Sequence, residues 1–154
     1  MPARVVESIH GLEDLLGREI GPTDWFTVTQ ERIGQFAEAT EDRQWIHVDS
    51  ERARRQSPYG ATIAHGFLTL SLLSHLLKQA IHVRGVRMGV NYGLNRVRFP
   101  APVPAGSRIR ARVVLNSVKE FGGGSEAVFS FTVEREGSDK PCCAAEWVVR
   151  YYSE

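Results

Sequence analysis

Residues 63–80 read IAHGFLTLSLLSHLLKQA, and this stretch decides the fold. A His-Gly pair opens it, and the apolar side chains that follow surround most of the circumference of a helix running from about Phe67 to Ala80. Such a helix should be buried on nearly all sides, so it needs walls on several of them. A curved sheet wrapped around the helix would supply those walls.

The second half of the chain predicts that sheet. Three segments alternate apolar and polar side chains as half-buried strands do, at residues 108–115, 127–133 and 145–151. Short turns join them, which favours an antiparallel meander. Residues 86–99 also look extended, whereas the proline-rich run 100–104 cannot lie in a central strand. We therefore predict an α+β fold, a single domain over residues 1–154 with an antiparallel sheet wrapped around the long central helix.

Shorter elements are expected before the helix. Residues 1–20 should form an N-terminal helical extension, with an amphipathic helix from Ile9 to Leu16. A short strand over 25–29 precedes a helix over 31–39, which Thr27 or Thr29 can cap. A second short helix over 51–55 can be capped by Asp49 or Ser50.

Composition excludes some classes of function. The net charge is +1, which gives no electrostatic footprint for nucleic acid. No apolar run approaches the ~18 residues of a membrane span, and the N-terminus lacks the features of a signal peptide, so we expect a cytoplasmic protein. Cys142 and Cys143 are adjacent in a predicted strand and should face opposite ways, which disfavours a bridge between them. His75 and His82 have no evident third ligand, so no metal site is expected.

The stretch between the two short helices holds the candidate site. Residues 40–49 read TEDRQWIHVD, with Asp42 and His47 five residues apart. We expect this pair and the start of the long helix to form one active site. Asp49 competes with Asp42 as the partner of His47, although capping is its more common role. His65 could also take part in catalysis, but a histidine at a buried helix start more often satisfies backbone groups.

Three runs of the sequence carry a resemblance, FAEATEDRQWIHVD (36–49), IAHGFLTLSLLS (63–74) and NYGLNRVRFPAPVPAGSRI (91–109). Together they resemble the MaoC-like dehydratase family, which includes (R)-specific enoyl-CoA hydratases, and the third run is similar to its nodulation-protein-N-like branch. The likeness covers roughly residues 20–152. It implies a hot-dog fold, the sheet-around-helix arrangement predicted above, and an acyl-CoA thioester substrate. Because such a sheet leaves exposed edges, we expect edge-to-edge pairing into a homodimer, with acyl chains bound near the interface.

The resemblance also implies roles for residues. The family's catalytic acid and histidine fall on Asp42 and His47, and its thioester-binding backbone amide falls on Gly66. A serine that helps to orient the acid in some members falls on Ser74. The commonest family motif is Gly-Asp-x-Asn-Pro-x-His; here Glu41 replaces the glycine, and Gln44 and Trp45 replace Asn-Pro, which makes Trp45 a candidate wall of the substrate pocket.

Hydration of a 2-enoyl thioester needs a base for water, an acid for the α-carbon and a group that holds the enolate charge. His47, Asp42 and the Gly66 amide suit these three roles. We therefore expect an (R)-specific enoyl-CoA hydratase, a hydro-lyase that adds water reversibly and syn to trans-2-enoyl-CoA and needs no cofactor beyond the coenzyme A of its substrate. Arg96 and Arg98 could bind the coenzyme A phosphates or line a solvated face. A hot-dog acyl-CoA thioesterase and a non-catalytic acyl-thioester binding protein remain alternatives.

Overall fold

The computed structural model describes residues 2–154. In chain order the elements are β1 (Arg4–Val6), the 3-10 helix η1 (Ile9–Leu15), β2 (Glu19–Ile20), β3 (Phe26–Thr27), α1 (Gln30–Thr40), α2 (Trp45–Val48), α3 (Ser50–Gln56), α4 (Gly66–Ser71), α5 (Leu73–Ala80), β4 (Ile81–Val83), β5 (Val86–Arg98), β6 (Arg108–Phe121), β7 (Gly124–Arg135) and β8 (Cys143–Ser153).

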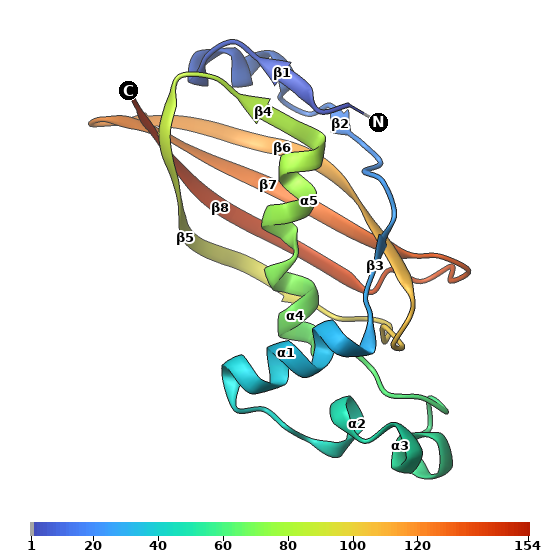
Figure 1. Cartoon of the computed structure of the whole chain (residues 1–154). Helices are drawn as coiled ribbons and strands as arrows, with labels where there is room; N and C mark the ends of the chain where they lie inside the picture. The colour runs from blue at the N-terminus through green and yellow to red at the C-terminus, as the bar shows by residue number, and fades with distance from the viewer. Residues whose placement is uncertain (1) are drawn as a thin grey trace.

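One six-stranded sheet dominates the fold. Its order is β2-β6-β7-β8-β5, with β3 also paired to β6. The neighbours β6-β7, β7-β8 and β8-β5 are all antiparallel, as the meander prediction requires. A separate two-stranded parallel sheet joins β1 to β4. Figure 1 shows the large sheet curving behind α4 and α5, so the predicted α+β arrangement of a sheet around a central helix is confirmed.

The central helix is almost continuous. Leu72 separates α4 from α5, but its amide bonds back to the Leu68 carbonyl at 3.1 Å and its carbonyl accepts from Leu76 at 3.0 Å. The inward side of the helix meets the inward side of the strands. The buried residues of these two surfaces are Leu68, Leu73, Leu76 and Leu77 on the helix and Ile109, Ala111, Val113, Leu115, Phe129, Phe131, Val133 and Val149 on the sheet.

The expectation that this helix is buried on nearly all sides is wrong. A stripe at positions 67, 71, 74 and 78, spaced by four, three and four residues, stays exposed along its whole length. The phenyl ring of Phe67 is 70% exposed at its start. The sheet is open at the edge strand β5, so it walls the helix on one side and leaves this stripe uncovered.

The shorter elements match their predictions in part. Thr29 caps α1 by accepting from the Arg32 amide, and Asp49 caps α3 by accepting from the Arg52 amide. The prediction of a helical extension over residues 1–20 is wrong in part, because the 3-10 helix η1 lies there between the strands β1 and β2. Strand β4 and the one-turn helix α2 were not predicted either. The cysteines Cys142 and Cys143 are both free and buried, so the expectation of no bridge between them is confirmed. Burial raises the pKa of these two thiols to about 12 and about 11. No helix among residues 2–154 has the length and apolar character needed to cross a bilayer.

Candidate active site

Three segments meet where α1, α2 and the start of α4 come together, at the lower end of the molecule in Figure 1. Asp42 follows α1, His47 lies on α2, and His65 immediately precedes α4. One ligand-type atom from each of these side chains lies within 4.8 Å of the other two. The structure therefore brings the predicted acid and histidine together beside the start of the central helix.

The loop that carries Asp42 turns sharply at Glu41. Glu41 has φ 63° and ψ 13°, which is left-handed backbone that costs most L-residues roughly 1–2 kcal/mol. This is the position at which the related motif has glycine. The Arg43 guanidinium pairs with the carboxylates of Glu38, at 2.8 Å, and Glu41, which braces the turn from outside. Asp42 itself is exposed and accepts from the Gln44 amide at 3.4 Å.

His47 is held in one tautomer. Its Nδ1 lies 2.7 Å from the Ile63 carbonyl oxygen. A carbonyl can only accept, so in the neutral ring Nδ1 carries the proton and Nε2 keeps its lone pair. Burial lowers the pKa of His47, a shift that the hydrogen bond to the Ile63 carbonyl partly opposes. A neutral imidazole with a free Nε2 is the form that accepts a proton.

His65 packs against both halves of the pair. Its ring lies 3.8 Å from the His47 ring, nearly parallel at 21°, and its Nε2 is 2.9 Å from the backbone carbonyl oxygen of Asp42. The side chain is only 2% exposed. Of the two readings that the sequence allowed for His65, the structure shows the one in which it satisfies a backbone group.

Three supporting residues were missed by sequence reasoning. Gln30, at the start of α1, donates its side-chain amide to the His47 carbonyl at 2.8 Å and accepts from the Thr62 hydroxyl. The Ile63 amide donates to the Ile46 carbonyl at 3.0 Å. These contacts fix α2 against the segment that precedes α4. They join residues up to 32 positions apart, and polar residues at such separations leave no local pattern in a sequence.

Gly66 is the first residue of α4, where backbone amides lack an acceptor within the helix. The Phe99 ring lies against its Cα, since a Cβ built on Gly66 would come within 2.9 Å of that ring. Gly66 and Phe99 line a hollow of about 250 Å³ together with the run from Pro100 to Val103. A glycine therefore keeps this backbone accessible beneath an aromatic ring.

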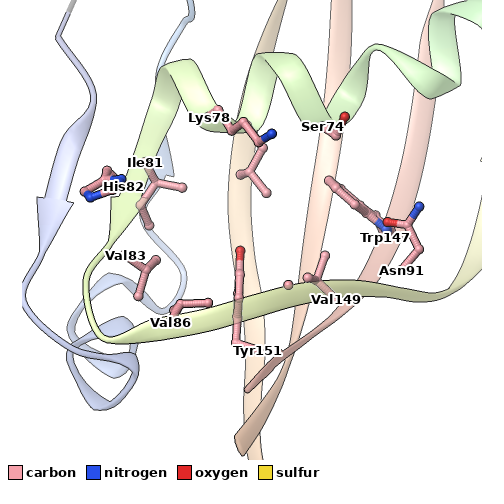
Figure 2. A pocket seen from close by; sticks show the side chains of 12 residues that line it. Ser74, Lys78, Ile81, His82, Val83, Val86, Asn91, Trp147, Val149 and Tyr151 are labelled. Atoms are coloured by element: carbon pink, nitrogen blue, oxygen red, sulfur yellow. The ribbon is translucent and has the colours of Figure 1, made fainter. Parts of the chain in front are cut away.

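Ser74 lies eight residues beyond Gly66, on the exposed stripe of the helix. It lines two adjoining hollows of about 350 and 330 Å³ between α5 and the strands β5 and β8, and Asn91 and Trp147 line both as well. Figure 2 shows the larger one, with Ser74 and Lys78 on the helix facing Trp147 and Tyr151 across it. Most of the other lining side chains are aliphatic.

The remaining predicted site residues lie on other surfaces. Trp45 begins α2 and is half-buried under the Arg52 guanidinium, 4.2 Å from its ring centroid. Arg96 and Arg98 are exposed on β5, and Arg98 donates to the Val97 carbonyl. Their binding roles stay predictions.

The cluster of Asp42, His47 and His65 has the residue types of a metal site. Two of its histidine nitrogens are already engaged, Nδ1 of His47 with Ile63 and Nε2 of His65 with the Asp42 carbonyl. The remaining nitrogen, Nδ1 of His65, is fully buried, so a metal could reach it only by displacing the side chains packed around it. The arrangement suits proton transfer better. His75 and His82 lie on α5 and β4, so they do not share a helix face.

A long helix in a curved antiparallel sheet defines the hot-dog class of proteins. Within that class, the MaoC like domain matches residues 12–134. The chain is 54% identical over 149 residues to 3-hydroxyacyl-thioester dehydratase Z of Mycobacterium tuberculosis, covering 96% of this chain and 98% of that protein. It is 47% identical over 144 residues to nodulation protein N of Rhizobium leguminosarum bv. viciae, covering 92% and 89% respectively.

A solved structure gives the same assignment of fold. The (R)-hydratase from A. caviae involved in PHA biosynthesis superposes with a TM-score of 0.71 at 24% identity, covering 87% of this chain and 94% of that one. The protein belongs to the MaoC-like family and is an enzyme of its dehydratase class, a hydro-lyase.

Proposed function

We propose that the protein is an (R)-specific enoyl-CoA hydratase, which interconverts trans-2-enoyl-CoA and (R)-3-hydroxyacyl-CoA. The observation that carries the proposal is the free Nε2 of His47, fixed by the Ile63 carbonyl and placed beside Asp42 and the start of α4. A base with this tautomer can activate water without a metal or a cofactor.

In the proposed reaction His47 and Asp42 share one water. Its hydroxyl group adds to the β-carbon of the enoyl thioester, and its proton, relayed by the pair, reaches the α-carbon. Because both parts of the water arrive from the same side, the addition is syn. The backbone amide of Gly66 holds the thioester oxygen while it carries enolate charge, and a donor in this role is typically worth ~3–4 kcal/mol in the transition state.

The two hollows beside Ser74 suit the acyl chain. They are lined largely by apolar groups from α5, β5 and β8, and Ser74 stands at the point where they adjoin. We propose that the acyl chain of the substrate enters past Ser74. We also propose that Ser74 helps to orient the carboxylate of Asp42. The exposed guanidinium groups of Arg96 and Arg98 are proposed contacts for the coenzyme A phosphates, and Trp45 is a proposed wall of the substrate pocket.

We propose a homodimer as the working form. Strand β5 is an edge of the sheet, since β8 is its one neighbour in the six-stranded order. An unpaired edge of 13 residues is a template for another strand. Its exposed large apolar side chains are Met88, Val90, Tyr92 and Leu94. Pairing of β5 with a second copy would cover these groups.

Incubation with a short trans-2-enoyl-CoA tests the function. Loss of the conjugated absorbance without release of free thiol identifies a hydratase, whereas free thiol identifies a thioesterase. The stereochemistry of the product is read by an (R)-specific 3-hydroxyacyl-CoA dehydrogenase. If a series of chain lengths is bound and neither signal appears, the protein is an acyl-thioester binder and the proposal fails.

The roles of the pair are tested by substitution. Asp42→Asn and His47→Asn should each lower turnover at least ~100-fold, the usual scale for acid–base groups, with folding intact by circular dichroism. Asp49→Asn is the matched control, because Asp49 caps α3 and should leave turnover near that of the wild type. Near-normal activity in either Asp42→Asn or His47→Asn would remove the assignment.

A further inference from the structure

We propose that His65 is the positioning residue of this active site: it fixes Asp42 through the backbone and His47 through ring stacking. The inference rests on the proposed roles of Asp42 and His47. It goes beyond them, because His65 would act without touching the substrate.

The hydrogen bond to Asp42 has a defined direction. The Asp42 carbonyl oxygen can only accept, so in the neutral ring of His65 the proton is on Nε2, 2.9 Å away. The other nitrogen, Nδ1, is fully buried and finds no hydrogen-bond partner among residues 2–154. His65, at the start of α4, thus donates one side-chain N–H group. The acceptor is the backbone carbonyl of Asp42, the proposed acid, 23 residues earlier in the chain.

The other contacts of Asp42 do little to fix its position. Its carboxylate is exposed, and among residues 2–154 it accepts only one hydrogen bond, a long one of 3.4 Å from the Gln44 amide. The preceding residue, Glu41, holds left-handed backbone that a chain does not adopt by preference. The hydrogen bond from His65 anchors this loop to the protein interior. It therefore fixes the backbone position from which the Asp42 side chain extends.

The same ring fixes the orientation of His47. His47 is bound at its edge by the Ile63 carbonyl and covered on one face by His65, at a centroid separation of 3.8 Å. His65 is in turn backed by the Phe36 ring of α1 at 4.9 Å. Both proposed catalytic groups therefore take their positions from one buried side chain. Displacement of a reacting group by about 1 Å can cost on the order of 100-fold in rate.

Two substitutions separate the donor of His65 from its bulk. His65→Phe keeps an aromatic ring against His47 but removes the Nε2–H donor. His65→Gln keeps a donor near the same point but removes the ring. We expect His65→Phe to lower kcat by roughly 10- to 100-fold with KM within about threefold of the wild type, since substrate binding does not depend on it. His65→Gln restores the donor to Asp42 but removes the ring that stacks on His47, so it should lower kcat as well, and the size of each loss measures one of the two contacts. His75→Phe, on an exposed part of α5, is the matched control.

A double variant shows whether His65 acts through Asp42. Combining His65→Phe with Asp42→Asn should cost little more than Asp42→Asn alone, because a residue that positions a group has no effect once that group is removed. A kcat for His65→Phe near that of the wild type overturns the inference. Full additivity of the losses from His65→Phe and Asp42→Asn would mean that His65 acts only as a packing residue. If Asp42→Asn is itself active, the proposed function fails instead, so the two failures are distinguishable.

Discussion

At the scale of single residues, His47 has the two properties of a general base. Its Nδ1 proton is held by the Ile63 carbonyl, and burial lowers its pKa from the ordinary 6.5. The ring therefore stays neutral at pH values where an exposed histidine would be half charged. The proposed role of His47 as a base near neutral pH therefore depends on the position of this residue in the fold.

We expect the acid limb of the pH profile of kcat/KM to have an apparent pKa below 6.5, the ordinary value for histidine. The same shift affects stability. Below about 6.5 the unfolded chain binds a proton that folded His47 does not, so the free energy of unfolding falls as the pH falls through that value. Urea unfolding of the wild type and of His47→Gln between pH 5 and 8 measures this difference. An acid limb well above 6.5 would contradict the burial argument.

The backbone conformation of Glu41 shapes the loop that carries Asp42. Left-handed backbone disfavours β-branched side chains most, so Glu41→Val should unfold more easily than Glu41→Gly by about 1–2 kcal/mol. Glu41→Gly should stay within about 1 kcal/mol of the wild type, because relief of strain is offset by the flexibility of glycine and the loss of an exposed ion pair. Denaturant midpoints measure both, and equal midpoints for Val and Gly would mean that the turn is not left-handed in solution.

At the scale of elements, the site depends on how α1, α2 and the segment before α4 are joined. Gln30 is the joint: it donates to the His47 carbonyl and accepts from Thr62, whose side chain is buried. Helix α2 is a single turn and has no capping side chain. It is held by the link through Gln30 and by two hydrogen bonds to the backbone of Ile63. A one-turn helix is not stable alone, so its orientation comes from these partners.

Gln30→Leu should therefore destabilise the protein by about 1–3 kcal/mol, since it leaves a buried hydroxyl and a carbonyl without partners. It should also lower kcat, because His47 loses part of its support. Gln35→Leu, on the exposed side of the same helix, should change stability by no more than about 0.5 kcal/mol. Thermal unfolding and turnover of the two variants make the comparison. Equal stability would show that Gln30 has no special role.

At the scale of the whole molecule, the exposed stripe of the central helix lies beside the exposed edge strand β5. The exposed stripe on the helix begins with Phe67, and the edge strand β5 carries further exposed apolar side chains. Exposed apolar side chains that gather on one face of a folded chain are typical of an interaction surface. The proposed homodimer would account for both.

We expect light scattering to give a dimer for the wild type. Val90→Lys places a charge on the edge strand and should shift the protein toward monomer, because burying an unpaired charge is costly. Val5→Lys is the matched control, an exposed valine on β1 at the other sheet. A monomeric wild type, or a dimer that survives Val90→Lys unchanged, would contradict pairing through β5.

Much of this architecture was determined by the sequence itself. Alternation in β6, β7 and β8 predicted the meander, and candidate capping residues predicted where two helices begin, although only the structure chose Thr29 over Thr27 and Asp49 over Ser50. These features were readable because strand alternation and helix capping act between residues close in sequence. The acid–histidine spacing and the His-Gly pair selected residues that the structure brings together beside the start of α4.

Only the tertiary structure decided how the site is built. The Ile63 carbonyl that sets the tautomer of His47, the stacking of His65 and the bridge through Gln30 all join distant parts of the chain. The exposed stripe of the helix likewise depends on where the sheet stops, which the composition of the helix does not encode. Contacts of this kind depend on how distant elements are placed relative to one another, so no local sequence pattern predicts them. The sequence therefore selected the residues, and the packing of α1, α2 and α4 gave them their geometry.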